Sequence, residues 1–275
     1  MPKRSRTVFF VSDGTGITAE MLGHSLLTQF EGIEFTQVVL PFVDTAEKAR
    51  ACLEQIEDVK ARSEARPIVF CTLVDESVRS MLRRADALVL DFFEGFINPL
   101  EGEFGIRSSH AVGRSHSVAH NKEYQDRIEA VNYALAHDDG LGSRELARAD
   151  VILVGVSRSG KTPTCLYMAM QFGIKAANYP LTPDDFERGE LPGAVAPLVG
   201  KLFGLTITPE RLSEIRQERR PDSRYARLEN CRYEIEEAEK LMRRHGIEWL
   251  NSTTRSIEEI ATKVLQAVKL ERRAY

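Results

Sequence analysis

Residues 149–162 read ADVILVGVSRSGKT, an apolar, strand-like run followed by a glycine-rich loop. Positions 155–162 match the pattern GxxxxGK[ST] of a phosphate-binding loop, or P-loop. Glycines are needed there because backbone N–H groups must converge on an anion, and side chains would block the ligand or the required dihedral angles. The apolar run before the motif and the helical pattern over 162–172 after it supply the context that the motif requires. This stretch therefore predicts a strand, a phosphate-binding loop and a helix in succession.

Individual loop residues have expected roles in a nucleotide site. Lys161 would place a compact positive charge against the terminal phosphates, and the hydroxyl of Thr162 would bind Mg²⁺. Arg158 would stabilise charge that develops during phosphoryl transfer. The residues expected to bind the nucleotide are Gly155, Val156, Ser157, Arg158, Ser159, Gly160, Lys161 and Thr162. The motif predicts a nucleotide-dependent phosphotransferase, although a binding module without chemistry also fits the motif taken alone.

The remainder of the chain predicts an α/β fold. Short, nearly continuous apolar segments separated by helical patterns indicate a parallel sheet covered on both faces. We expect an N-terminal parallel-sheet α/β domain (1–100), a connecting segment and helix (101–145), and a P-loop kinase-like α/β domain (146–275). The expected strands are 8–11, 35–40, 67–72, 87–91, 149–154 and 202–207. The expected helices are 17–30, 46–59, 76–84, 124–136, 162–172, one that starts at Thr208, 225–244 and 256–268. Thr208 would be the N-cap of its helix, and Ser256 with Glu259 would form a capping box at the start of the last helix.

The stretch 95–123 has no clear periodicity and is rich in Gly, Ser and His. It predicts an inter-domain connection or a mobile loop. Its histidines, His110, His116 and His120, are not accompanied by a carboxylate or thiolate pattern, which argues against a metal site.

Composition excludes several classes of function. The formal net charge of −4 argues against general electrostatic binding to nucleic acid, and the cluster of Arg216, Arg219 and Arg220 favours a solvated helix face. The four cysteines have no CxxC spacing, so neither a zinc site nor a disulfide framework is indicated. No apolar run approaches the roughly 18 residues of a membrane span. We expect a cytoplasmic protein with no nucleic-acid or membrane partner.

Acidic residues near the P-loop are candidates for chemistry. His137-Asp138-Asp139-Gly140 follows the helix expected at 124–136, and Gly140 would be the C-terminal cap of that helix. Two acids at a helix C-terminus oppose the helix dipole, so a compensating partner is expected. Asp138 and Asp139 could accept a hydroxyl proton or hold Mg²⁺, and a surface turn is the alternative. The acid that holds the metal stays open, with Asp91, Asp184 and Asp185 as further candidates.

A second glycine-rich loop, Ser12-Asp13-Gly14-Thr15-Gly16, follows the first expected strand. It would lie at the carboxyl edge of a parallel sheet, where ligands tend to bind. Gly14 and Gly16 would let a phosphate or a phosphorylated side chain approach the backbone. The alternative is a helix start capped by Thr15 or Asp13.

These motifs together resemble a known family. The segments SDGTG-x-TAE, HDDG, GVSRSGKTPT, MQFGIKAANYPL and GLTI-x-PERL are similar to those of the phosphoenolpyruvate synthase regulatory proteins, which are related to the pyruvate, phosphate dikinase regulatory proteins. The likeness extends over essentially the whole chain, through Asn251-Ser252-Thr253 and the last helix. It is far more specific than the P-loop motif alone, and the family's ADP-binding loop corresponds to residues 155–162 without departure.

The resemblance implies a bifunctional enzyme. Members phosphorylate a threonine of the target protein with ADP as donor, and remove that phosphate with inorganic phosphate, releasing pyrophosphate. If ADP is the donor, Lys161 and the loop N–H groups would lie on the reacting β-phosphate. Roles for Asp138, Asp139, Asp13 and Thr15 are inferred from their chemistry and not carried over from the family.

Other functions fit parts of the same pattern. Phosphoenolpyruvate synthase is the expected partner, and pyruvate, phosphate dikinase is the alternative target. An ATP-dependent small-molecule kinase would use the same strand, loop and helix, and a nucleotide-sensing regulatory protein would bind without catalysis. The sequence leaves the oligomeric state open, with a homodimer as one arrangement.

Overall fold

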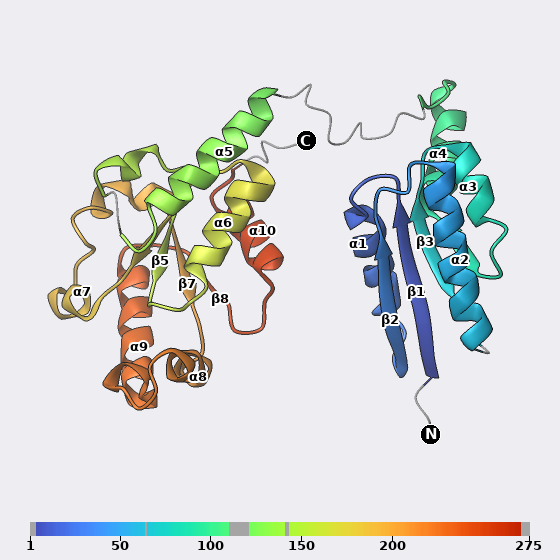
Figure 1. The fold of residues 1–275 in the computed structure, drawn as a ribbon. Coiled ribbons are helices and arrows are strands. Elements are labelled where there is room, and N and C mark those ends of the chain that lie inside the picture. The colour runs from blue at the N-terminus through green and yellow to red at the C-terminus, as the bar shows by residue number, and fades with distance from the viewer. Residues whose placement is uncertain (1–3, 64, 110–120, 141–142, 271–275) are drawn as a thin grey trace. The chain divides into compact units, whose positions relative to one another are not determined.

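The computed structural model describes residues 4–63, 65–109, 121–140 and 143–270 (Figure 1). The chain divides into two compact units, Met1–Ser117 and Val118–Tyr275. Each unit contains a four-stranded sheet in which every strand pair is parallel. The predicted α/β class with two parallel-sheet parts is therefore confirmed. The three histidines considered above, at positions 110, 116 and 120, lie outside the described residues.

The first unit alternates strands with helices. Its elements are β1 (Arg4–Ser12), α1 (Ile17–Leu27), β2 (Ile33–Leu40), α2 (Ala46–Arg62), β3 (Ile68–Thr72), α3 (Glu76–Leu82), β4 (Leu88–Asp91) and α4 (Phe92–Phe104). The strand order is β2-β1-β3-β4. Phe9 and Val11 of β1 belong to a core with α2 and α3, whereas Val8 and Phe10 pack with Ala19 of α1. This alternation explains why residues 8–11 of the strand are all apolar, since both of its faces are covered there.

The second unit has the same strand topology. Its elements are α5 (Asn121–Ala136), β5 (Val151–Gly155), α6 (Lys161–Phe172), β6 (Ala176–Pro180), α7 (Pro183–Arg188), β7 (Leu202–Thr206), α8 (Pro209–Arg219), α9 (Leu228–Arg244), β8 (Trp249–Asn251) and α10 (Ile257–Ala267). Three 3-10 helices lie between them, at Ser143–Arg148 (η2), Ala196–Lys201 (η3) and Arg224–Ala226 (η4). The order β6-β5-β7-β8 places β5 centrally, and all five of its residues are buried.

Several elements differ from the sequence prediction. Residues 95–104, expected as a loop, belong to α4, which begins where the Asp91 carboxylate accepts a hydrogen bond from the Glu94 N–H. The sequence analysis did not predict this helix because it contains residues that disfavour helices, namely Gly95, Pro99 and Gly102. The apolar residues Phe96, Leu100 and Phe104 nevertheless recur at four-residue steps. The short β6, β8 and α7 were missed because three to six residues carry too little periodicity to be recognised.

The expected helix caps are partly confirmed. Ser256 and Glu259 form the predicted capping box of α10. Thr208 lies at the N-cap of α8 as predicted, but its side chain makes no capping hydrogen bond. The Thr208 N–H instead binds the Thr253 hydroxyl at 2.8 Å, which links the start of α8 to the loop after β8.

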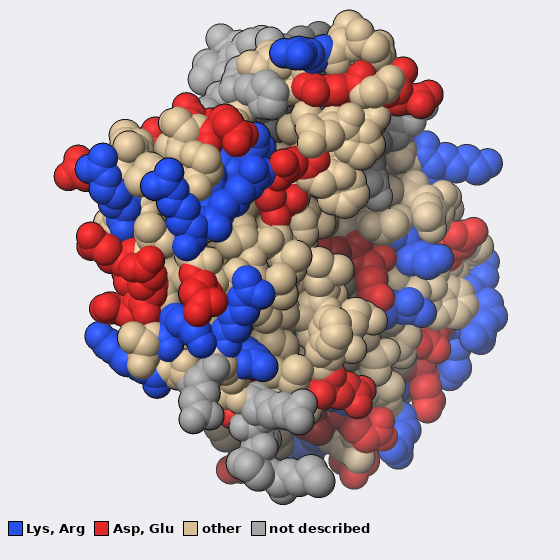
Figure 2. Space-filling view, turned by 90° about the vertical axis from the view of Figure 1, so that its right-hand side faces the viewer, with Lys and Arg blue, Asp and Glu red and all other residues tan. Residues whose placement is uncertain are grey.

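Charged side chains of both signs are mixed over the face of the molecule shown in Figure 2. Opposite charges also pair four residues apart along the chain, such as Lys48 with Asp44 (2.6 Å) and Arg62 with Asp58 (3.3 Å). Exposed pairs of this kind are screened by solvent and contribute little to stability, so they are not what holds the fold together. None of the described helices is both long enough and apolar enough to cross a bilayer.

Gly23 is the point at which α1 approaches the first sheet most closely. A Cβ atom there would collide with the Phe10 ring and lie 2.7 Å from Phe70 Cδ2. We predict that Gly23→Ala lowers the free energy of unfolding by about 1–3 kcal/mol through overpacking, although Ala favours helix. Gly102→Ala is the matched control, because its Cβ would enter open space on α4 and should stabilise by about 0.5–1 kcal/mol. Urea unfolding followed by circular dichroism measures both, and equal shifts would contradict the close-packing explanation.

Candidate functional site

The loop between β5 and α6 has the backbone shape that its glycines were expected to permit. Gly155 has φ 143°, and a Cβ atom there would clash with the Leu205 carbonyl oxygen on the neighbouring β7. Gly160 has φ 93° and forms the N-cap of α6 in the left-handed conformation. Both positions therefore need glycine for steric reasons. Arg158 is also left-handed, with φ 75°, and its side chain is exposed.

Lys161 is a buried cation at the N-terminus of α6. It is 3% exposed, and its Nζ donates to the Val156 carbonyl oxygen at 2.8 Å. Burial lowers the pKa of Lys161 to about 8, and the nearby Asp139 and Asp138 oppose that shift. A cation is also unfavourable at the positive end of a helix dipole. An anionic ligand would offset both costs, because it would pair with the ammonium and face the helix N-terminus.

A second polar group in the loop lacks a partner. Ser159 is 1% exposed, and its hydroxyl makes no hydrogen bond within the described residues. Ser252 links the Ser159 backbone to the end of β7, because its Oγ lies 2.9 Å from the Ser159 carbonyl oxygen and 3.0 Å from that of Thr206. Buried hydroxyls normally find a hydrogen-bond partner. The Ser159 hydroxyl is therefore an exception to this rule within the described residues.

Asp138 and Asp139 follow α5, and their contacts bring them beside the loop between β5 and α6. A role in phosphoryl transfer or metal binding requires this proximity. Asp138 Oδ1 accepts from the Thr162 hydroxyl at 2.8 Å and from Asn178 Nδ2 at 2.5 Å. The same amide nitrogen lies 3.2 Å from Asp139 Oδ1 and 3.0 Å from Thr162 Oγ1. These donors, together with Lys161, supply the compensation that two acids at a helix C-terminus require.

Asn178 was missed by the sequence analysis. It is 2% exposed in the middle of β6, and its Oδ1 is buried with no hydrogen-bond partner within the described residues. The available signal was a polar residue inside the otherwise apolar run at 176–181. A buried amide costs free energy unless it is bonded, so its position implies a specific partner such as the two acids.

The HDDG turn is held by β6, and the predicted cap is wrong. Helix α5 ends at Ala136, and the Gly140 N–H donates to the Asn178 carbonyl oxygen at 3.1 Å, not to a helix carbonyl. The Asn178 N–H in turn donates to the His137 carbonyl oxygen at 3.0 Å. Asp139 has φ 50° and is exposed, whereas Asp138 is half-buried. The two carboxylates therefore differ in accessibility although they are adjacent in sequence.

Comparison with known proteins identifies the family of this chain. The model of the kinase/pyrophosphorylase family matches residues 8–265. The chain belongs to the kinase/pyrophosphorylase family.

Full-length relatives agree with this assignment. A protein of Aromatoleum aromaticum is 64% identical over 271 residues, and one of Azoarcus sp. is 63% identical, each match covering 98% of both chains. A Burkholderia multivorans protein is 61% identical over 269 residues, which is 98% of this chain and 99% of the relative. All three carry names that describe them as phosphoenolpyruvate synthase regulatory proteins.

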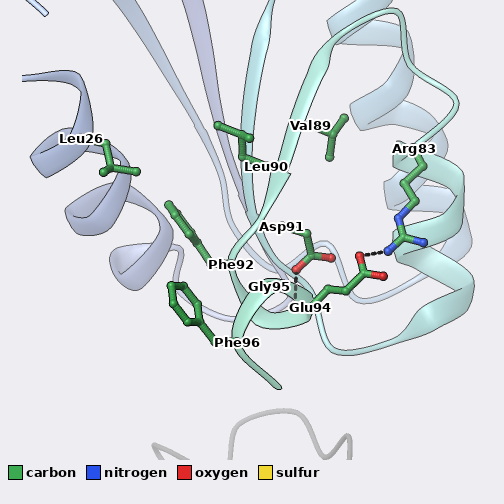
Figure 3. A pocket seen from close by; sticks show the side chains of 9 residues that line it. All are labelled: Leu26, Arg83, Val89, Leu90, Asp91, Phe92, Glu94, Gly95 and Phe96. Atoms are coloured by element: carbon green, nitrogen blue, oxygen red, sulfur yellow. Dashed lines mark hydrogen bonds and ion pairs between the residues drawn. The ribbon is translucent and has the colours of Figure 1, made fainter. Parts of the chain in front are cut away.

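Two of the other acids considered as metal ligands have structural partners. Asp91 lies in the first unit, where it caps α4 and lies 3.6 Å from Arg79 Nε. Figure 3 shows it beside the Arg83–Glu94 ion pair, in a pocket of about 630 Å³ whose other wall is apolar. Asp185 is 4% exposed and accepts from the Thr182 N–H and hydroxyl at the start of α7. Asp184, next to it, is exposed.

The Ser12–Gly16 loop is tied to its neighbours by other bonds than those expected. Helix α1 starts at Gly16 with no side-chain cap, so capping by Thr15 or Asp13 is wrong. Asp13 Oδ2 instead accepts from the Val74 N–H at 2.7 Å, linking the loops after β1 and β3. Burial raises the pKa of Asp13, although that backbone bond lowers it. Binding of a phosphate by this loop stays a prediction.

The cluster around Thr162 offers ligands that suit Mg²⁺. Mg²⁺ prefers oxygen ligands and is usually bound through one or two carboxylates plus substrate phosphates and water. Thr162 Oγ1 and Asp138 Oδ1 lie 2.8 Å apart, so two suitable oxygens already converge at the loop. Within the described residues, no group of three or more His, Cys, Asp or Glu side chains forms a ready-made metal site. The donor set therefore fits an ion held jointly with a phosphate ligand.

The pKa of Lys161 makes stability depend on pH in a defined window. Between about 8, its folded value, and 10.5, its ordinary value, the unfolded chain binds a proton that the folded chain does not, so stability rises with pH. We predict that the wild type gains on the order of 3 kcal/mol over Lys161→Met across this window. Urea unfolding of both proteins from pH 7 to 10 measures the difference, in which other titrating groups cancel. A constant difference would show that Lys161 does not titrate there.

Proposed function

We propose that this chain is a bifunctional regulator of phosphoenolpyruvate synthase. It would phosphorylate a threonine of the synthase with ADP as donor, and remove that phosphate with inorganic phosphate, releasing pyrophosphate. The family description, which pairs a kinase with a pyrophosphorylase, and the relatives' names support this proposal. The observation that carries it is the juxtaposition of the loop, Lys161 and the Asp138–Thr162–Asn178–Asp139 cluster.

One phosphate-binding site, called the cradle below and made of the loop N–H groups and Lys161, would serve both directions of the reaction. The loop N–H groups and Lys161 would bind an anion at the start of α6, where a negative charge is favoured, and Lys161 Nζ would exchange its bond to the Val156 carbonyl for the anion. In the kinase direction this space would hold the β-phosphate of ADP. In the other direction it would hold inorganic phosphate and then the new pyrophosphate. Both ligands are phosphate anions, so the same donors suit both.

In the kinase direction, the threonine hydroxyl oxygen would attack the β-phosphorus of ADP. A new oxygen–phosphorus bond forms, the bond to the bridging oxygen breaks, and AMP leaves. Asp139 is the better placed of the two acids to accept the hydroxyl proton, because it is exposed. Asp138 is already bonded to Thr162 and Asn178, so its part would be to orient the Thr162 hydroxyl.

In the phosphorylase direction, an oxygen of inorganic phosphate would attack the phosphorus of the phosphothreonine. The bond between that phosphorus and the threonine oxygen breaks and pyrophosphate forms. Asp139 would take a proton from the attacking inorganic phosphate and pass it to the leaving threonine oxygen. Arg158, exposed in the loop, would stabilise charge on the transferring group in both directions. Thr162 and Asp138 would hold Mg²⁺, which supplies charge neutralisation to the phosphates when bound.

Lys161→Ala is predicted to abolish both activities. The variant removes the charge that the shared cradle depends on, so transfer from ADP and release of pyrophosphate should fall together. The kinase direction is measured with purified phosphoenolpyruvate synthase and β-labelled ADP. The other direction is measured with the threonine-phosphorylated form of the same synthase and inorganic phosphate. Phosphate-dependent dephosphorylation at the wild-type rate would disprove the shared site. Transfer from γ-labelled ATP alone would disprove ADP as donor.

Asp139→Asn is predicted to lower kcat by about 10²- to 10⁴-fold while the Kd for ADP changes little. The amide keeps the size of the side chain but cannot take up the proton. Asp126→Asn is the matched control, since Asp126 is an exposed acid on α5 of the same unit and is not a candidate site residue. Initial rates with labelled ADP and calorimetric titration of ADP separate the two effects. An equal kcat in Asp139→Asn and the control would remove Asp139 from the mechanism.

A further inference from the structure

Arg216 of α8 is fully buried, which overturns the solvated helix face expected for its cluster. It is 0% exposed, whereas Arg219 and Arg220 remain at the surface. Its Nη2 donates to the Ser157 carbonyl oxygen of the loop at 3.2 Å and to Glu234 Oε2 at 2.7 Å. An arginine in the interior costs several kcal/mol in lost hydration unless its partners are well placed. The burial of this arginine beside the P-loop therefore needs a structural explanation.

Tyr225 of η4 binds the same loop residue. Its hydroxyl donates to Ser157 Oγ at 3.0 Å, and its carbonyl oxygen accepts from Arg216 Nη1 at 3.0 Å. The Arg216 guanidinium lies over the Tyr225 ring, 4.0 Å from its centroid, which adds a cation–π contact. Ser157 is thus held at its backbone by one residue and at its side chain by the other.

Glu234 of α9 fixes Arg216 in turn. It is 7% exposed and accepts from Asn230 Nδ2 at 2.6 Å as well as from the guanidinium. The chain of contacts runs from α9 through α8 and η4 to the loop. The three residues Arg216, Tyr225 and Glu234 are called the Ser157 clamp below.

The clamp acts on a carbonyl whose direction matters for anion binding. Loop N–H groups can converge on a phosphate only if enough of the alternating carbonyls point away from it. Arg216 holds one of those carbonyls, that of Ser157, against the helical layer. The Arg216 charge also reaches the cradle, because it contributes to lowering the pKa of Lys161.

We propose that the Ser157 clamp is a positioning device that presets the P-loop for its phosphate ligand. Without it, the loop would have to be ordered at the moment of binding, and that entropy would be subtracted from affinity. The part of the proposal that concerns ADP rests on the proposed function. The part that concerns loop order in the free protein does not.

Tyr225→Phe tests the clamp with little risk to folding, because the ring and the backbone carbonyl remain. Hydrogen exchange of amides 155–161 should be faster than in the wild type, and the Kd for ADP should rise about 3- to 10-fold. The control is Tyr233→Phe, which alters a 47% exposed tyrosine on α9. The two variants should have the same midpoint of thermal unfolding. Arg216→Lys, which keeps the charge but loses the planar fork, should show the larger effect on both readouts.

A double variant identifies the bond itself. Ser157→Ala combined with Tyr225→Phe should exchange no faster than either single variant, because both remove the same hydrogen bond. Unchanged loop exchange in Tyr225→Phe would overturn the proposal, as would faster exchange with unchanged ADP affinity. If the wild type binds no ADP but the loop exchange responds as expected, the proposed function fails while the clamp stands.

Discussion

A buried ammonium group at the start of a helix is the constraint on which the rest of the second unit depends. Lys161 is removed from water at the end of α6 where the helix dipole repels it, so each neighbouring element offsets that cost. The Val156 carbonyl accepts from it, and Asp138 and Asp139 lie close enough to favour its charge. Such an arrangement costs stability in the free protein and is useful only when an anion arrives.

The strand order explains where the acids come from. In the order β6-β5-β7-β8, the loop after the central β5 lies where neighbouring connections run to opposite sides, the position at which parallel sheets bind ligands. β6 pairs alongside β5 and carries Asn178, which holds the HDDG turn by backbone and side chain alike. The first unit has the same order, and the Ser12–Gly16 loop occupies the equivalent place at its own sheet. The two loops differ in what surrounds them, since Asp13 is bonded to Val74.

Much of the fold could be predicted because its signals are local. The apolar runs of β1 and β5, the glycines of the loop and the Ser256–Glu259 capping box act through neighbouring residues, so sequence patterns recorded them. Helix α4 was missed because its glycines and Pro99 mask a regular apolar spacing. Asn178 and Arg216 were missed or misread for a different reason. Asn178 lies 40 and 39 residues from Asp138 and Asp139, and Arg216 lies 59 residues from Ser157. A local pattern therefore does not reveal which residues they contact.

The sequence by itself determined that a glycine-rich loop with the GxxxxGK[ST] pattern joins a buried strand to a helix, because the steric requirements of the loop are met within eight consecutive residues. It also determined which acids were available. Only the tertiary structure decided how those acids differ, with Asp138 bonded to Thr162 and Asn178 and Asp139 left exposed. It likewise decided that Arg216 is an interior residue bound to Ser157. Exposure and pairing are set by residues distant in the chain, and packing alone brings those residues together.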